Sequence, residues 1–545
     1  MPNFIAKPRL VDTKRGFSVY YNERYLFSKY DPQKSFTTLV NNTLILNNSL
    51  IICVSPVLQF PIDILLQKLE REHCNNCFIL AIEKNNDLYN FFTENMVTHS
   101  NVAIANISSE YDITLLLENK NHCKYVGSKI PPLAQFKRLI VFDASSEATV
   151  HRDFYARSIQ IAQNSITQFW KNRATLMKLG KLFSKNTIKN VKKLKNTSFF
   201  PHKTVSKPIL VVGAGTSLDS LIPFIKEYEQ SFYILAIAAA MRPLLDNDIT
   251  PDAIVTVEAQ YATERAFIGT KNKRIPLFAD LVSRPSILNI LKGETYFYVS
   301  EYTKSPLLNR IKEFFPQLPL IDPLGSVGLT CTEIACMIRQ NSSVPICVCG
   351  LDFSYIAGKS HCNESPHIKY ALQYSHRFSP FGNVGAAYSY GSEHVIGKNN
   401  QHVATDKALK GYGDLFSARY KNVKNLFDIS SFGLVNELPQ SSIDDVINLL
   451  NRNRSELNST ELTMLPCYED ATIDSFYKNE TSLLESIKNV LIGKKTVDQK
   501  ELLSLIDSCN YLYTHFPDGH ECATLRQDFL NRIRFEVDYF LKGIS

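Results

Sequence analysis

The stretch ILVVGAGTSLDSL combines the residue types that bind phosphate groups. An apolar run leads into Gly213 and Gly215, where backbone N–H groups can face outward, and Thr216 and Ser217 then precede a predicted helix. A helix N-terminus carries a partial positive charge that favours anions, and the two hydroxyls can donate to phosphate oxygens. A leucine stands where a dinucleotide fingerprint has its third glycine, and no Walker lysine follows. The stretch therefore predicts a loop for a smaller phosphorylated ligand or, as the alternative, a tight strand-to-helix turn.

Two further stretches place polar groups where ligands bind in parallel sheets. DPLGSVGLTCTE puts Gly325 and Ser326 before a predicted helix, which gives a second anion-binding N-terminus. PDAIVTVEAQ puts Glu258 and Gln260 after a predicted strand, and ligands collect at the carboxyl ends of parallel strands. Asp252 precedes the same strand and is predicted to be a cap or turn residue.

A fourth stretch, GLDFSYIAGKSHCNESPH, follows a buried strand and gathers titratable groups on a polar loop. Asp352 or His361 could act there as a general base that takes a proton from an acceptor hydroxyl. Tyr355, Lys359 and His367 share the loop. The histidine spacings match no metal signature, so we predict no metal site.

The elements that position these groups alternate between apolar strands and amphipathic helices. This alternation predicts a doubly wound, Rossmann-like α/β domain. Its strands are expected at 208–213, 233–240, 251–260, 275–280, 295–300 and 344–353.

Four segments are expected along the chain of 545 residues, which is too long for one core. Residues 1–150 predict a smaller α/β domain, 151–207 a basic helical connector, 208–438 the central Rossmann-like domain and 439–545 a helical C-terminal domain.

The net charge of +7 is unevenly distributed. Residues 154–218 contain twelve Lys and Arg side chains and no Asp or Glu, which fits an acidic protein or an anionic small molecule. The aromatic residues there recur with Ile and Leu at helical spacing, which suits packing better than base stacking, so we predict no nucleic-acid partner. The longest apolar stretch, YILAIAAAM, is too short to span a membrane, and the N-terminus has no signal peptide pattern. We therefore predict a cytoplasmic protein.

Six stretches of the sequence, in order, resemble motifs of the motility accessory factor (Maf) family of flagellin glycosyltransferases. YNERYLFSKYDPQKSF resembles that family's YDP element, and GAGTSL resembles its GxGPSL loop. PLLDNDITPDAIVTVEAQ, GSVGLTCTEIA and GLDFSYIAGKSH resemble its later motifs, and VATDKALKGYGDLFSARYKNVKNLFDIS resembles the stretch that closes the domain. This chain has a threonine in place of the family's proline in the first glycine loop, and a glutamate at 258 where an aspartate is usual.

The resemblance implies a central domain similar to bacterial sialyltransferases, with an MptE-like core. It implies transfer of a nonulosonic acid of the pseudaminic or legionaminic type from its CMP-activated form to Ser or Thr of flagellin. The transfer would be inverting and metal-independent, without a cofactor. The expected nucleotide contacts are Gly213, Gly215, Thr216, Ser217, Gln260, Gly325 and Ser326, and the expected catalytic groups are His361, Asp352 and Glu258.

Two alternatives stay open. A related branch resembles the same central domain and implies an ATP-dependent pterin diphosphokinase, for which Asp252 and Glu258 would have to supply a carboxylate pair facing magnesium. A non-catalytic flagellin-binding protein that kept the fold is the other.

Overall fold

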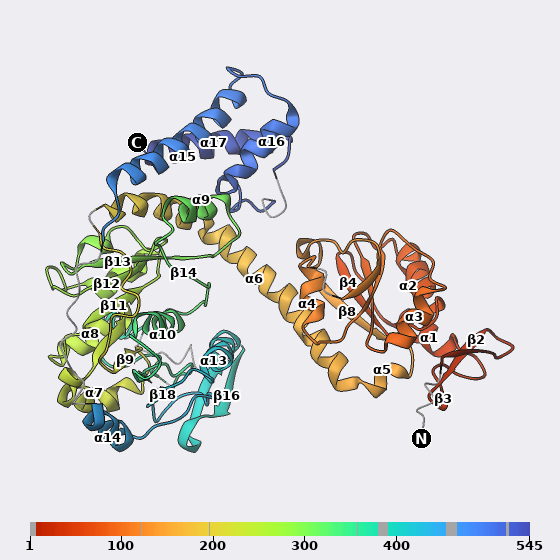
Figure 1. The fold of residues 1–545 in the computed structure, drawn as a ribbon, viewed down its shortest axis with the longest axis horizontal. Coiled ribbons are helices and arrows are strands. Elements are labelled where there is room, and N and C mark those ends of the chain that lie inside the picture. The colour runs from red at the N-terminus through yellow and green to blue at the C-terminus, as the bar shows by residue number, and fades with distance from the viewer. Residues whose placement is uncertain are drawn as a thin grey trace. The chain divides into compact units, whose positions relative to one another are not determined.

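The computed structural model describes residues 7–120, 123–195, 197–356, 358–379, 391–453, 466–518 and 523–544. The chain divides into two compact units, Met1–Lys178 and Leu179–Ser545 (Figure 1). Each unit has its own parallel sheet and its own hydrophobic core.

The first unit contains a five-stranded sheet with the strand order β7-β6-β5-β4-β8, parallel except for the antiparallel edge strand β7. A small antiparallel sheet, β1-β2-β3, precedes it in the chain. The strands are β1 Arg9–Asp12, β2 Phe17–Tyr21, β3 Arg24–Tyr25, β4 Ser49–Val54, β5 Phe78–Glu83, β6 Val102–Asn106, β7 Lys124–Gly127 and β8 Arg138–Asp143. The helices are α1 Lys34–Asn42, α2 Phe60–Arg71, α3 Asn86–Thr93, α4 Asp112–Leu117 and α5 Glu147–Val150.

The central strand β4 shows why this sheet needs cover on both faces. Leu50, Ile52 and Val54 belong to one hydrophobic cluster, while Ile51 and Cys53 belong to another. Successive side chains of a strand point to opposite faces, so a continuous apolar run is buried only between two layers of helices.

The helix α6 (Arg152–Val191) runs for 40 residues from the first unit into the second. Its early residues Tyr155 and Ile166 pack in the core of the first unit, and Ile188 and Val191 pack in that of the second. The segment expected to be a basic helical connector is thus occupied, over Arg152–Val191, by a single helix.

The second unit contains an eight-stranded sheet in which every strand is parallel to its neighbours. The strand order is β14-β13-β12-β11-β10-β9-β15-β18, and a separate hairpin, β16-β17, lies outside it. The strands are β9 Ile209–Val212, β10 Tyr233–Ile237, β11 Ala253–Thr256, β12 Leu277–Asp280, β13 Thr295–Ser300, β14 Leu320–Ile321, β15 Ile346–Cys349, β16 Ser392–Ile396, β17 His402–Asp406 and β18 Leu426–Asp428.

Helices cover both faces of this sheet. Leu210 and Val212 of β9 belong to the cluster that contains apolar residues of α7 (Leu218–Glu227), α8 (Ala238–Asp246) and α9 (Pro306–Phe314). Ile209 and Val211 belong to the cluster that contains residues of α10 (Val327–Ile338) and α13 (Lys407–Tyr420). The helix α11 (Pro366–Gln373) follows β15 in the chain and precedes the hairpin.

The C-terminal segment contains the helices α14 (Ile443–Asn453), α15 (Asp470–Leu491), α16 (Gln499–Ser508) and α17 (Gln527–Ile544). Its acidic groups pair with the basic segment. Lys181 contacts Glu536 at 2.8 Å, and Lys195 contacts Asp470 at 2.6 Å. Part of the predicted cationic surface is therefore used inside the second unit.

The expected alternation of strands and helices is confirmed as a mixed α/β fold with parallel sheets. Three of the expected strands end three or four residues too late. The strands expected over 251–260 and 344–353 end at Thr256 and Cys349. The strand expected over 233–240 ends at Ile237, and Ala238 begins α8. Alanine has the highest helix propensity, so the alanine run extends a helix and not a strand. The described helices include none that is long and apolar enough to cross a membrane.

Candidate functional site

The strand order places a topological switch point between β9 and β15. From β9 the chain continues to β10 on one side, whereas β15 lies on the other side and is followed there by β18. Ligands of open parallel sheets bind outside the carboxyl ends of the strands at such a point, because the following loops diverge there. The loops that follow β9 and β15 are the glycine loop at 213–217 and the loop at 350–353.

These two loops pack backbone against backbone. The N–H of Gly213 donates to the carbonyl of Cys349 at 2.8 Å, and the N–H of Gly215 donates to that of Gly350 at 2.8 Å. A Cβ at Gly213 would lie 2.2 Å from the carbonyl oxygen of Gly350, and one at Gly215 would lie 2.5 Å from the carboxyl carbon of Asp352. The glycines are therefore required by the neighbouring loop, independently of any ligand.

Asp352 holds the start of α7. Its buried carboxylate accepts hydrogen bonds from the backbone N–H of Ser217 at 2.8 Å, from the Thr216 hydroxyl at 3.1 Å and from the Ser217 hydroxyl. Burial raises the pKa of this carboxyl, while the bonds from Ser217 and Thr216 and the charge of Lys398 act in the opposite direction. The anion predicted for this helix N-terminus is thus supplied, in this structure, by the protein's own carboxylate.

Thr216 and Ser217 were expected to donate their hydroxyls to a phosphate. Both side chains are buried and engaged by Asp352. A phosphate contact through them stays a prediction and requires Asp352 to release them. Asp352 itself, expected to be a catalytic group, lies 3% exposed beneath the glycine loop.

The second glycine loop, at 325–328, packs against Leu351, which also contacts the first glycine loop. A Cβ at Gly328, in the first turn of α10, would lie 2.4 Å from Cδ2 of Leu351, and a Cβ at Gly213 would lie 2.5 Å from the same atom. Gly325 has a φ of +72°, a conformation that side chains disfavour, and Ser326 caps α10 without a side-chain hydrogen bond. The two glycine loops therefore meet at one leucine, and α10 offers the less occupied helix N-terminus.

His361 lies next to Cys362, whose backbone is hydrogen-bonded to the glycine loop. The N–H of Cys362 donates to the carbonyl of Ala214 at 2.9 Å, and Nδ1 of His361 lies 2.9 Å from the Ser360 hydroxyl. Burial, assisted by the charge of His367, lowers the pKa of His361 to about 4. The imidazole is neutral at pH 7 and can accept a proton, although its basicity is low in this state.

Glu258 and Gln260 lie farther away. They follow β11, which is two strands from β9, a separation of about 10 Å at the usual strand spacing. Oε1 of Glu258 accepts the N–H of Gln260 at 3.0 Å, and the Glu258 carbonyl accepts that of Arg284 at 3.1 Å. They share the carboxyl edge of the sheet with the glycine loop but not its hydrogen bonds.

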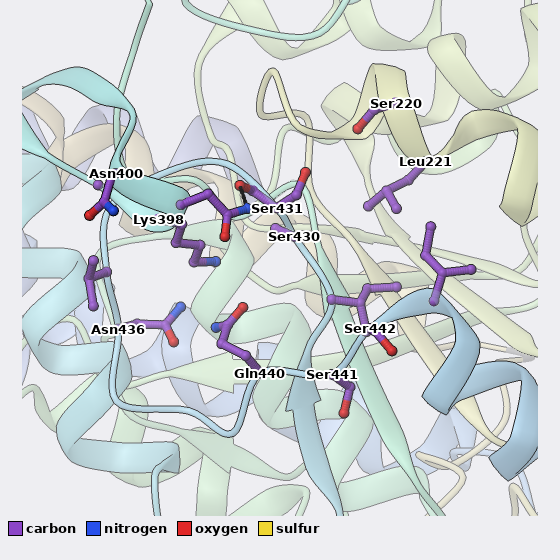
Figure 2. A pocket seen from close by; sticks show the side chains of 15 residues that line it. Ser220, Leu221, Lys398, Asn400, Ser430, Ser431, Asn436, Gln440, Ser441 and Ser442 are labelled. Atoms are coloured by element: carbon purple, nitrogen blue, oxygen red, sulfur yellow. Dashed lines mark hydrogen bonds between the residues drawn. The ribbon is translucent and has the colours of Figure 1, made fainter.

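A pocket of ≈ 740 Å³ opens beside this edge, and none of the predicted site residues lines it. Asp428 is the last residue of β18, and its carboxylate accepts hydrogen bonds from two lining residues, Lys398 and Asn436, each at 2.5 Å. Figure 2 shows Lys398, Asn436 and Gln440 pointing toward one another in the pocket. Its lining residues are Ser220, Leu221, Gly397, Lys398, Asn399, Asn400, Ile429, Ser430, Ser431, Val435, Asn436, Gln440, Ser441, Ser442 and Ile443.

Sequence reasoning missed these residues. Asp428 ends the short run LFD, just as Asp352 follows a strand, and that parallel was the available signal.

Gly433 links the pocket to the loop that contains Asp352. A Cβ at Gly433 would lie 2.8 Å from Cα of Asp352, and the N–H of the next residue, Leu434, donates to the Asp352 carbonyl at 2.8 Å. No group of three or more His, Cys, Asp or Glu side chains suited to a metal ion occurs among the residues that the structure describes.

Fold and site together define an α/β protein whose second unit joins two glycine loops at the switch point of a parallel sheet. A family model described as 6-hydroxymethylpterin diphosphokinase MptE-like matches residues 184–358, from the end of α6 to the loop after β15. The structure of a MAf glycosyltransferase from Magnetospirillum magneticum AMB-1 matches 99% of this chain and 91% of its own, with a TM-score of 0.56 and 15% identity. An uncharacterized protein of Treponema pallidum (strain Nichols) is 28% identical over 562 residues, which cover 99% of this chain and 95% of that protein.

The expected resemblance to the Maf family is confirmed in the fold. The chain has the fold of a Maf glycosyltransferase along nearly its whole length, and its central part matches the MptE-like family model.

Proposed function

We propose that this protein is a glycosyltransferase that transfers a nonulosonic acid from its CMP-activated form to Ser or Thr of flagellin. The proposal is supported by the fold shared with a Maf glycosyltransferase and, within the site, by one observation. Two glycine loops distant in sequence, at Gly213 and at Gly328, both pack on Leu351 at the switch point.

The donor phosphate is assigned to the N-terminus of α10. The N-terminus of α7 is already neutralised by Asp352, whereas Ser326 leaves the first amides of α10 without a side-chain cap. Gly325 and Ser326 then contact the phosphate, and Gly213, Gly215, Thr216 and Ser217 form the wall beside the nucleotide. Asp352 acts as a positioning residue for that wall.

The reaction is an inverting displacement at the anomeric carbon. The acceptor hydroxyl oxygen forms a bond to that carbon while the bond from the carbon to the phosphate oxygen breaks, and CMP leaves with the bonding electron pair. The hydroxyl proton passes to His361, the proposed base. The amides at the start of α10 stabilise the charge that develops on the phosphate, so the step proceeds without a metal ion.

The low basicity of His361 in this structure fits such a role only when the donor is bound. A phosphate close to an imidazole favours its charged form and raises its pKa toward the range in which a general base works best. Glu258 stays a proposed catalytic carboxylate and Gln260 a proposed nucleotide contact, both reaching the ligand from the neighbouring part of the edge.

The family model's description gives a second candidate, a pterin diphosphokinase. Its chemistry requires two carboxylates that hold magnesium together. Asp252 directly precedes β11, where its carboxylate accepts the N–H of Ile234, and Glu258 follows the same strand. Six residues of extended chain separate the two carboxylates by about 20 Å. This pair cannot share one ion, which favours the transferase. A non-catalytic flagellin-binding protein is the third candidate.

Calorimetry with CMP, CTP and ATP, each with magnesium and with EDTA, separates the three candidates. Binding of CMP in EDTA supports the glycosyltransferase. Binding of ATP that requires magnesium, without binding of CMP, supports the diphosphokinase, and the absence of all nucleotide binding supports the non-catalytic protein.

A further inference from the structure

The pocket beside β18 has the chemistry of a saccharide site. Nine of its fifteen lining residues are Ser, Asn or Gln, four are aliphatic, one is glycine and Lys398 alone is charged. Ser, Asn and Gln side chains both donate and accept hydrogen bonds, as sugar hydroxyls do. The volume of ≈ 740 Å³ lies within the range of small-molecule sites.

Charge in the pocket is balanced, which argues against a phosphate ligand. Lys398 is 7% exposed, and its ammonium group is bonded to the carboxylate of Asp428. Asn436 donates to the same carboxylate, so the buried ion pair is held from two sides. An anion would have to compete with Asp428, whereas an uncharged hydroxyl group would not.

Several polar side chains of the pocket are without a hydrogen-bond partner among the residues that the structure describes. The side chains of Ser430, Ser431, Gln440 and Ser441 make no hydrogen bond to any other residue that the structure describes. Ser430 lines the pocket although only 3% of the residue is exposed, so its hydroxyl can be reached by a ligand or by water from the pocket.

The pocket is continuous with the glycine loop. Ser220, which lines it, lies in the first turn of α7 and donates to the carbonyl of Ser217 at 2.9 Å. One helical turn advances about 5.4 Å, so the pocket begins within about that distance of the N-terminus of α7. The segment from Gly433 to Asn436, which forms another wall, packs on Asp352.

From these observations we infer that the pocket between α7, residues 397–400 and residues 429–443 binds a saccharide ring through Ser430, Ser431 and Gln440. This inference rests on the proposed function where the ring is taken to be the glycosyl part of the donor. The ring can belong to the glycosyl part of a nucleotide sugar or to a separate glycan.

The test uses calorimetry on the full chain with CMP, CMP-N-acetylneuraminic acid, N-acetylneuraminic acid and N-acetylglucosamine. The variant is the double substitution Ser431→Ala with Gln440→Ala, which removes two exposed side chains without changing the packing. Gln317→Ala is the matched control, since Gln317 is exposed and precedes β14 at the opposite edge of the sheet.

The double substitution is expected to weaken a saccharide-bearing probe by about tenfold, as the loss of two ordinary hydrogen bonds implies, and to leave CMP within about twofold. The control leaves all affinities unchanged. CMP-N-acetylneuraminic acid binding more tightly than CMP identifies the glycosyl part of the donor as the ring. Binding of a free saccharide in the presence of saturating CMP identifies a separate glycan.

The inference is overturned if the double variant binds every saccharide-bearing probe as the unmodified chain does. It is also overturned if the unmodified chain binds no free saccharide and does not distinguish CMP-N-acetylneuraminic acid from CMP. Failure of the proposed function gives a different pattern: saccharide binding that is sensitive to the double substitution, with no CMP binding.

Discussion

Replacing Asp352 by alanine tests whether this carboxylate positions the glycine loop. The substitution removes the acceptor of three hydrogen bonds, two from hydroxyl groups and one from the backbone N–H of Ser217. The hydroxyl groups can rotate to other acceptors, but the N–H becomes a buried donor without a partner, which costs about 1–3 kcal/mol.

A loss of about 2 kcal/mol corresponds to about 30-fold in an equilibrium constant. We therefore expect Asp352→Ala to lower the free energy of unfolding by about 2 kcal/mol and to weaken CMP binding by up to about 30-fold, because the loop must be ordered again when the nucleotide binds. Urea unfolding and calorimetry measure the two quantities. Asp352→Asn keeps an oxygen for the Ser217 N–H, so its affinity should fall by less than about fivefold.

The kinetic signature separates positioning from catalysis. A positioning role predicts that Asp352→Ala raises the KM for the CMP-activated donor and that Asp352→Asn largely restores it. If Asp352→Ala binds CMP as tightly as the unmodified chain and loses only kcat, the carboxylate acts on the reacting atoms and the positioning role is refuted.

Three further predictions concern stability. Burial raises the pKa of Asp280 from 3.8 to about 6, so the folded state binds the proton more tightly and the free energy of unfolding decreases as pH rises from about 4 to 6. In urea unfolding, Asp280→Asn should therefore be more stabilising at pH 7 than at pH 4, by up to about 3 kcal/mol. An equal gain at both pH values would contradict this. Gly213→Ala places a Cβ 2.2 Å from a carbonyl oxygen and should lower the free energy of unfolding by more than about 3 kcal/mol. The control Gly411→Ala, in α13, has no atom within 4 Å of the new Cβ and should raise the free energy of unfolding by about 0.5–1 kcal/mol. Equal melting temperatures of the two variants would refute the packing explanation. Glu480 is fully buried and bonded to Arg310 and Tyr511, so Glu480→Ala should cost about 3–5 kcal/mol in urea unfolding, and a cost below about 1 kcal/mol would show that the pair is dispensable.

The buried strands could be predicted because their signal is local. The runs at β9 and β15 are apolar along their length, and those at β12 and β13 are apolar except at their ends, as is typical of strands covered on both faces. The three-residue strand β18 and the β16-β17 hairpin were not predicted. β18 has too few residues to show a period of two, and β17 has three consecutive buried residues, so its side chains do not alternate between buried and exposed.

The contacts of the candidate site could not be predicted from the sequence. Gly213 and Gly215 were expected to contact a nucleotide, which stays a prediction, whereas their packing in the structure is explained by the carbonyl of Gly350, more than 130 positions later. Likewise, the sequence shows Ser217 and Asp352 as separate candidates and gives no indication that one binds the other. Such pairings arise from tertiary packing, which periodicity and spacing do not encode.

The proposed transfer is tested most directly by incubating the chain with flagellin and a CMP-activated nonulosonic acid in EDTA and measuring the intact mass of flagellin. We predict that the mass rises by whole nonulosonic acid residues, that free CMP appears in equal amount, and that His361→Ala suppresses both. An unchanged flagellin mass while the chain binds CMP and flagellin would contradict the proposed transfer.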